Sequence, residues 1–177
     1  MKKTLLSAIG ATLMLLGHSS LIYAADGSID ISGGGVAGTT CTINGGSSNL
    51  SPQLPPVSPS ALAIAGSTAG RTPFQLQLTD CPTGGSVTTY FEPGPSVNFT
   101  TGRLTLDAGG ATNVEVGLLN DTFGRIQLGA PFGSQGSQVV SIATPTVNFN
   151  YYAQYESLGQ AGPGAANTRV EYSLIYQ

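Results

Sequence analysis

Apolar and polar residues alternate along most of the chain beyond residue 70. In the stretch from 73 to 81, Phe74, Leu76 and Leu78 fall on one face, and Gln75 and Gln77 fall on the other. A period of two predicts β-strands, and no helix-length stretch beyond residue 24 has a 3.6-residue apolar period. Short strands with Gly, Pro, Ser and Asn turns between them predict an all-β sandwich or barrel. The alternating runs occupy residues 73–81, 86–92, 102–106, 112–120, 124–129, 145–155 and 169–177.

The last of these runs departs from the usual sandwich pattern. It places Val170, Tyr172, Leu174 and Tyr176 on one face, and Gln177 follows directly, with no turn and no closing strand. We therefore expect the body of the domain to lack a final strand.

The opposite end of the chain carries a strand that the body does not need. In "SIDISGGG", Ile29 and Ile31 alternate with polar residues, and Gly33, Gly34 and Gly35 follow in a row. Glycine weakens the interior of a strand, so three together require a specific reason.

Residues 44–70 show no clean alternation and contain four prolines among many Ser, Ala and Gly residues. We expect a long connection there, with room for a short edge strand or a helical turn.

The first 24 residues have the pattern of a secretory signal peptide. Lys2 and Lys3 precede an apolar run from residue 5 to 16, and cleavage is expected after Ala24. The alternative is a membrane anchor, but the apolar run is shorter than the roughly 20 residues that span a bilayer. Residues 25–177 then form one ordinary domain.

Charge and cysteine content narrow the range of partners. Beyond residue 24 the chain keeps four arginines and nine acidic residues, a formal charge of −5, so we expect neither nucleic acid nor an anionic membrane surface as a partner. In an exported chain, the pair Cys41 and Cys81 predicts a disulfide; two free buried thiols are the alternative.

Catalytic chemistry finds little support in the sequence. The only histidine, His18, and both lysines precede residue 25, which excludes a Ser-His-Asp triad, a Schiff-base lysine and His-ligated zinc in the mature chain. The G-x-G-x-x-G match at residues 33–38 lacks the helix and the acidic residue that a dinucleotide site needs. A glycosidase pair of carboxylates stays formally open, but we expect the scattered acids to be solvated. No cofactor is expected.

The tyrosines of the last run have two interpretations. Tyr172 and Tyr176 could form an aromatic platform for sugars, but their alternation with Val170 and Leu174 favours a core and groove wall.

Several stretches together resemble one known family. These are "GSIDISG", "FQLQLTDC", "NVEVGLLND", "GRIQLG" and "FNYYAQY…AANTRVEYSLIYQ". In order and spacing, with the cysteine pair, they resemble a pilin subunit of the chaperone–usher pathway, in the type 1 fimbrial family, over the whole mature chain. The resemblance implies an incomplete immunoglobulin-like β-sandwich that lacks its last strand and is completed by a donor strand from a neighbouring subunit.

The same resemblance assigns roles to particular residues. Residues 25–38 become a donor-strand extension and residues 39–177 the pilin domain. Donor side chains would enter a neighbour's groove, and the Gln177 carboxylate would be held by a cationic site on a periplasmic chaperone. The donor positions are Ile29, Ile31, Gly33 and Gly35, and the groove positions are Val170, Tyr172, Leu174, Tyr176 and Gln177.

This chain departs from the family in having Gly34 and Gly35 after Gly33. Strict alternation from Ile31 points Gly33 and Gly35 inward, and Val36 is then out of phase unless a glycine bulge shifts it.

The resemblance implies a structural, non-enzymatic subunit that polymerises head-to-tail in a fimbria at the cell surface. Its implied partners are a periplasmic chaperone, an outer-membrane usher and neighbouring pilin subunits. The alternative is a minor adaptor or an adhesive subunit that binds a host receptor. Adhesins of this family usually carry an additional N-terminal lectin domain, for which this chain has no room.

Overall fold

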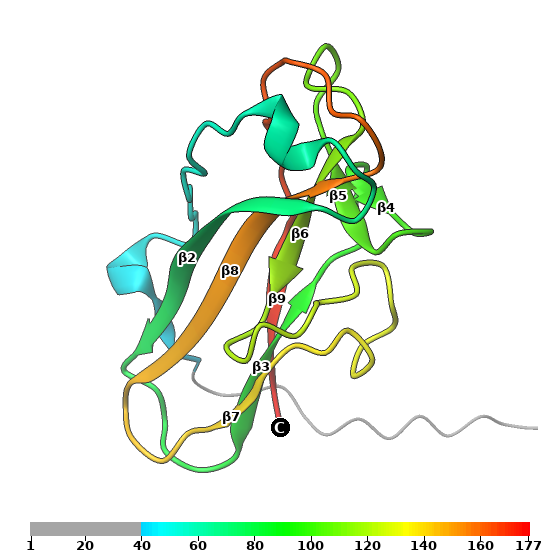
Figure 1. Ribbon diagram of the computed structural model, residues 1–177. Helices are drawn as coiled ribbons and strands as arrows, with labels where there is room; N and C mark the ends of the chain where they lie inside the picture. Colours follow the sequence, from blue (N-terminus) through cyan, green and yellow to red (C-terminus); the bar gives the residue numbers. More distant parts are fainter. Residues whose placement is uncertain (1–39) are drawn as a thin grey trace, which may run out of the picture. The chain divides into compact units, whose positions relative to one another are not determined.

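The computed structural model describes residues 40–177, which form two antiparallel β-sheets joined by loops and two short 3-10 helices (Figure 1). No helix within this part of the chain is long and apolar enough to cross a membrane. The strands are β1 (Thr42–Ile43), β2 (Thr68–Thr79), β3 (Ser86–Phe91), β4 (Val97–Asn98), β5 (Arg103–Thr105), β6 (Val114–Leu119), β7 (Val139–Ser141), β8 (Val147–Ser157) and β9 (Tyr172–Tyr176); the helices are η1 (Asn44–Gly46) and η2 (Pro59–Leu62).

The larger sheet has the strand order β1-β2-β8-β6-β5-β4. Its longest strands, β2 and β8, lie side by side (Figure 1). Phe74 lies opposite Tyr151 and Leu76 opposite Phe149. The alternation of the sequence explains this pairing, because a register shift of one residue would turn these side chains out of the core.

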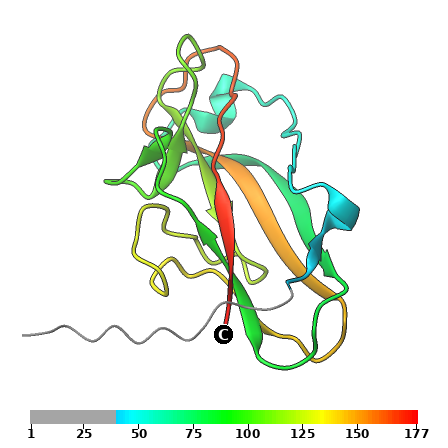
Figure 2. The ribbon, with the colours of Figure 1, turned by 180° about the vertical axis from the view of Figure 1, so that it is seen from behind.

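The smaller sheet has the order β7-β3-β9. Strand β3 lies in the middle, and the last strand of the chain, β9, lies at the edge of the sheet. Figure 2 brings this strand (red) to the near side of the molecule.

Inward-facing side chains from both sheets form a continuous core. Leu76, Leu78 and Phe149 from the larger sheet are almost completely buried, as is Val87 from the smaller sheet. The ring of Phe91 on β3 meets Tyr151 on β8 edge to face, with centroids 5.5 Å apart. This packing joins the two sheets into one sandwich.

Six of the seven predicted runs contain strands, namely β2, β3, β5, β6, β8 and β9. The prediction of a strand at residues 124–129 is wrong. Ile126 and Leu128 are buried as the alternation indicates, but their N–H groups bond to two different segments, at Leu118 and Gly102. No continuous ladder therefore forms.

Residues 44–70 form the expected connection. It contains the helical turns η1 and η2, and β2 begins at Thr68, before the connection was predicted to end. The short strands β1, β4 and β7 were not predicted. The predicted signal peptide (residues 1–24) and donor extension (residues 25–38), with Ile29, Ile31, Gly33 and Gly35, lie outside the described residues.

A buried network of charges corrects the expectation that the acidic residues are solvated. Glu115 on β6 and Glu156 on β8 are cross-strand neighbours, and only 2% and 1% of their surface is exposed. Arg103 and Arg125 approach the Glu156 carboxylate to 2.7 and 2.6 Å, and Arg103 also lies 3.6 Å from Glu115. Two buried carboxylates are tolerated here because guanidinium groups pair with them.

Candidate functional site at the free edge of strand β9

Among residues 40–177, strand β9 has a hydrogen-bonded partner on one side only. Ser86 and Gln177 exchange two backbone hydrogen bonds, of 2.8 and 2.9 Å, and the Glu92 N–H donates to the Glu171 carbonyl at 2.9 Å. In an antiparallel ladder, alternate residues point their backbone groups to opposite sides. The free edge of β9 therefore carries the N–H and C=O groups of the intervening residues, Tyr172, Leu174 and Tyr176.

The same three residues also turn their side chains toward the core. Together with Val170 they pack against the buried cluster, yet each is only half-buried. The structure thus brings four of the predicted groove residues onto one apolar face beside an unpaired backbone edge. Exposed apolar surface next to unpaired backbone groups is a template for an added strand.

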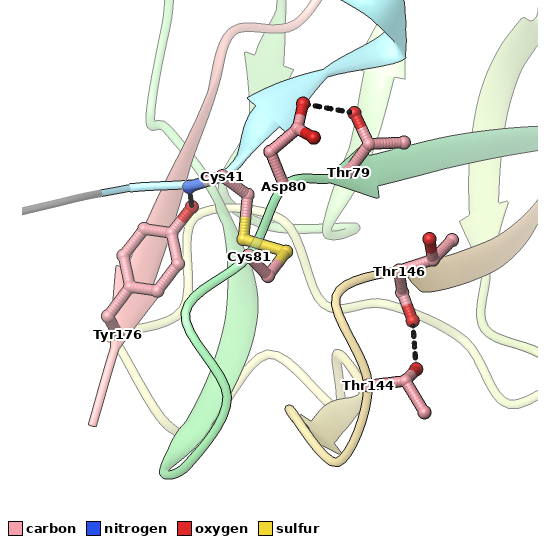
Figure 3. Close-up of a disulfide and its surroundings, with 7 residues drawn as sticks. All are labelled: Cys41, Thr79, Asp80, Cys81, Thr144, Thr146 and Tyr176. Atoms are coloured by element: carbon pink, nitrogen blue, oxygen red, sulfur yellow. Dashed lines mark hydrogen bonds between the residues drawn. A yellow bond between two sulfur atoms is a disulfide. The ribbon is translucent and has the colours of Figure 1, made fainter.

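Residues 41–57 form the opposite wall of this site, and two tyrosine hydroxyls connect the walls. The Cys41 N–H donates to the Tyr176 hydroxyl at 3.2 Å (Figure 3), and the Tyr172 hydroxyl donates to the Ser48 carbonyl at 2.7 Å. Burial raises the pKa of Tyr172 above its usual value. We call the surface between these walls the β9 strip.

The predicted disulfide closes one end of the β9 strip. Cys41 and Cys81 are bonded, both are buried, and their Cα atoms lie 4.3 Å apart (Figure 3). The Cys81 N–H donates to the Pro145 carbonyl at 3.0 Å, which ties the end of β2 to the start of β8. This end of the strip is therefore anchored to the larger sheet.

An apolar pocket of about 390 Å³ lies at the other end, beyond the first residue of β9. One wall comes from residues 54–59 and the other from residues 161–166. Leu62, Val114 and Tyr155 contribute from the body of the domain. We call this space the end pocket.

The chain terminus lies at the disulfide end of the strip. The Gln177 carboxylate accepts a backbone hydrogen bond from Ser86. All ion pairs found within residues 40–177 involve Arg103 or Arg125, so no arginine of this part pairs with the carboxylate. A cationic group from another molecule could reach it.

Sequence reasoning found one wall of the site and missed the other. The alternation of apolar and polar residues predicted the residues of β9. Ser48, Leu54 and Val57 lie in a proline-rich segment that shows no such alternation. Only the hydrogen bonds of the two tyrosine hydroxyls show that the chain around residues 41–48 faces β9.

The fold and the site together define a class of protein: a two-sheet β-sandwich with an apolar edge strand that is unpaired within residues 40–177. The family model described as "Type-1 fimbrial protein, A" matches residues 54–177. The chain belongs to this family of fimbrial subunits.

Individual relatives agree with the family assignment. The chain is 43% identical over 160 residues to the "Major fimbrial subunit SMF-1" of Stenotrophomonas maltophilia, covering 86% of this chain and 94% of the relative. It is 37% identical over 172 residues to the "F17 fimbrial protein" of Escherichia coli, covering 93% and 95%. The solved P pilus rod subunit PapA matches with a TM-score of 0.63 at 19% identity, covering 78% of this chain and 100% of PapA.

These comparisons confirm the predicted fold class, an incomplete immunoglobulin-like β-sandwich of the pilin type. They also confirm that the chain is a structural subunit of a fimbria at the cell surface, in a family of non-enzymatic proteins.

Proposed function

We propose that this subunit forms the shaft of the fimbria by head-to-tail polymerisation, in which each copy accepts the donor extension, residues 25–38, of the next copy along its β9 strip. The unpaired edge of β9 carries this proposal. It offers three residues with free backbone groups and half-buried side chains, which is what an incoming strand requires. A relative named as a major fimbrial subunit favours the shaft over a minor adaptor.

The geometry of such a contact favours an open filament. The donor segment and the β9 strip are different surfaces of one chain, so the contact is heterologous and does not close on itself. Each added copy presents a new strip, and growth continues.

The donor side chains follow from the sequence. Ile29 and Ile31 enter the apolar strip, and full burial of one such side chain contributes about 1.5–3 kcal/mol. Gly33 lies where the strip is too shallow for a side chain. Asp30 and Ser32 face the opposite side and stay in water.

A chaperone must cover the strip before assembly, because an exposed apolar edge promotes aggregation. We infer that a periplasmic chaperone lends a strand to β9 and supplies the cation that holds the Gln177 carboxylate. An outer-membrane usher then receives the complex. The absence of a basic partner for this carboxylate among residues 40–177 supports the cationic site.

Strand exchange with synthetic peptides tests the donor role. Purified chaperone–subunit complex is mixed with peptides of residues 25–38, and release of the chaperone is followed by gel shift. We expect the native and Asp30→Ala peptides to exchange. Ile31→Asp should be inert, because a carboxylate in an apolar slot costs several kcal/mol. Equal exchange by all three peptides would refute the donor role.

Truncation and imaging test the place of the subunit in the fibre. A mature chain that begins at Val36 should load onto the chaperone but terminate the growing fibre. Cells without the gene should lack the fimbrial shaft; loss of adhesion with shafts of normal length would instead indicate a minor adaptor or adhesive subunit.

A further inference from the structure

The end pocket raises a question about the three glycines of the donor segment. Its lining is mostly apolar and includes Leu54 and Val57 of the opposite wall and Ala166, which precedes β9 in the chain. A donor strand that follows the strip will reach it. An apolar cavity left unfilled inside an interface is unfavourable, because its lining loses contacts on one side.

The direction of the donor strand determines which residue arrives there. All strand pairs within residues 40–177 are antiparallel, and an antiparallel donor continues this arrangement. Leu174 is the central inward residue of β9, between Tyr172 and Tyr176, and we place Ile31 opposite it. The donor residues after Ile31 then run from Tyr172 toward the end pocket.

Strict alternation would leave the end pocket empty. The inward positions after Ile31 are Gly33 and Gly35, neither of which has a side chain. The nearest apolar side chain is that of Val36, which strict alternation turns away from the strip.

We propose that the donor segment changes phase within Gly33–Gly35, through a β-bulge, so that Val36 and not Gly35 faces the neighbour and fills its end pocket. This inference rests on the proposed donor-strand role and adds its register. A bulge inserts one extra residue, and one common type places a glycine in the left-handed conformation, which three consecutive glycines readily provide. The three glycines would then allow the bulge that turns the Val36 side chain toward the neighbour's groove.

Disulfide trapping between copies distinguishes the two phases in assembled fimbriae. Ala166 lines the end pocket and is therefore the position at which a cysteine tests its occupant. The full chain is expressed with Ala166→Cys combined with either Val36→Cys or Gly35→Cys. Isolated fimbriae are boiled in SDS with and without reductant. A disulfide requires Cβ atoms about 3.5–4.5 Å apart, so only the residue in the pocket cross-links efficiently.

We expect a reductant-sensitive ladder for Val36→Cys with Ala166→Cys, at least tenfold stronger than for Gly35→Cys with Ala166→Cys. The Ala166→Cys variant alone should give no ladder. Ile31→Cys with Leu174→Cys serves as the control for the donor role itself. Cross-linking of that control pair with a stronger ladder for Gly35→Cys, or with no ladder at Ala166, would overturn the phase change and leave the donor role intact. Fimbriae that form without any cross-link in the control pair would overturn both.

Discussion

Three tyrosine hydroxyls lie in surroundings that disfavour their ionised form. Burial raises the pKa of Tyr151, Tyr155 and Tyr172 above the usual value of 10.0. Tyr151 lies in the core with its hydroxyl 3.1 Å from the Ser137 hydroxyl. At the scale of single residues, these phenols make the free energy of unfolding depend on pH in the alkaline range.

The first prediction follows from the sign of these shifts. Below about pH 10 the phenols are protonated in both the folded and the unfolded chain, and their contribution is constant. Above it the unfolded chain loses protons first, so the free energy of unfolding falls as pH rises. Urea unfolding of the mature chain from pH 8 to 12 should show this decline, and Tyr151→Phe should make it shallower. A stability that does not change between pH 10 and 12 would contradict it.

A second prediction concerns the buried charges. Glu156→Gln removes the carboxylate that faces Arg103 and Arg125, which leaves Arg103 with Glu115 alone and Arg125 with no ion pair within residues 40–177. Breaking a buried pair in this way typically costs about 3–5 kcal/mol. The matched control is Glu171→Gln, an exposed glutamate without an ion pair in the described chain, which should change stability by less than about 0.5 kcal/mol. Equal denaturation midpoints for both variants would show that the network does not stabilise the fold.

At the scale of elements, the two faces of strand β9 make different contacts. Leu174 packs against the core cluster, while the adjacent Ile175 points to the opposite face. Both side chains are half-buried, so exposure alone does not separate their roles.

The third prediction uses this pair. Leu174→Thr should reduce recovery of the chaperone complex severalfold, because the apolar strip loses its central side chain, whereas Ile175→Thr should have a much smaller effect. Both changes keep a β-branched residue or introduce one, so strand propensity is preserved. The measurement is co-purification of tagged chaperone with each variant. If the Ile175 variant lost more complex, the assignment of the two faces would have to be reversed.

Strands β2 and β8 could be predicted from the sequence, because apolar residues recur at every second position in each long run and lie on the same buried face. Ile126 and Leu128 alternate just as clearly, yet their backbone bonds go to two separate segments, which no local pattern encodes. Strands β4 and β1 are two residues long and β7 is three, too short to show a period.

The candidate site divides in the same way. Residues of β9 were predictable because the strand is local and alternating. The opposite wall depends on contacts across more than 120 positions, from Tyr172 to Ser48 and from Tyr176 to Cys41. Burial of Glu115 and Glu156 likewise depends on Arg103 and Arg125, which other segments bring to them.

At the scale of the whole molecule, the Cys41–Cys81 bond compensates for a fold that lacks one strand. It closes a separation of 40 residues, for which the chain-entropy treatment gives about 4 kcal/mol of stabilisation. That contribution is comparable to the net stability of a small domain.

The fourth prediction is therefore a marked loss of exported subunit when the bond is removed. Cys41→Ser and Cys81→Ser should each lower the amount recovered from the periplasm severalfold. The double variant should behave like either single variant, because the cross-link itself is what is lost. Immunoblots of periplasmic extracts measure this. Recovery of all three variants at the native level would show that the bond is dispensable.

The position of this disulfide also determines how the subunit responds to a mechanical pull. Tension applied to the chain ahead of Thr40 meets Cys41 first and passes through the two sulfur atoms to Cys81 at the end of β2. Because the disulfide carries the force, residues 42–80 bear no tension and cannot be extended. This protects β1, which is held by only two residue pairs. Force enters the domain beside the β2–β8 ladder, its longest strand pair, where many hydrogen bonds share it. The subunit therefore resists lengthening at the point where the load enters its domain.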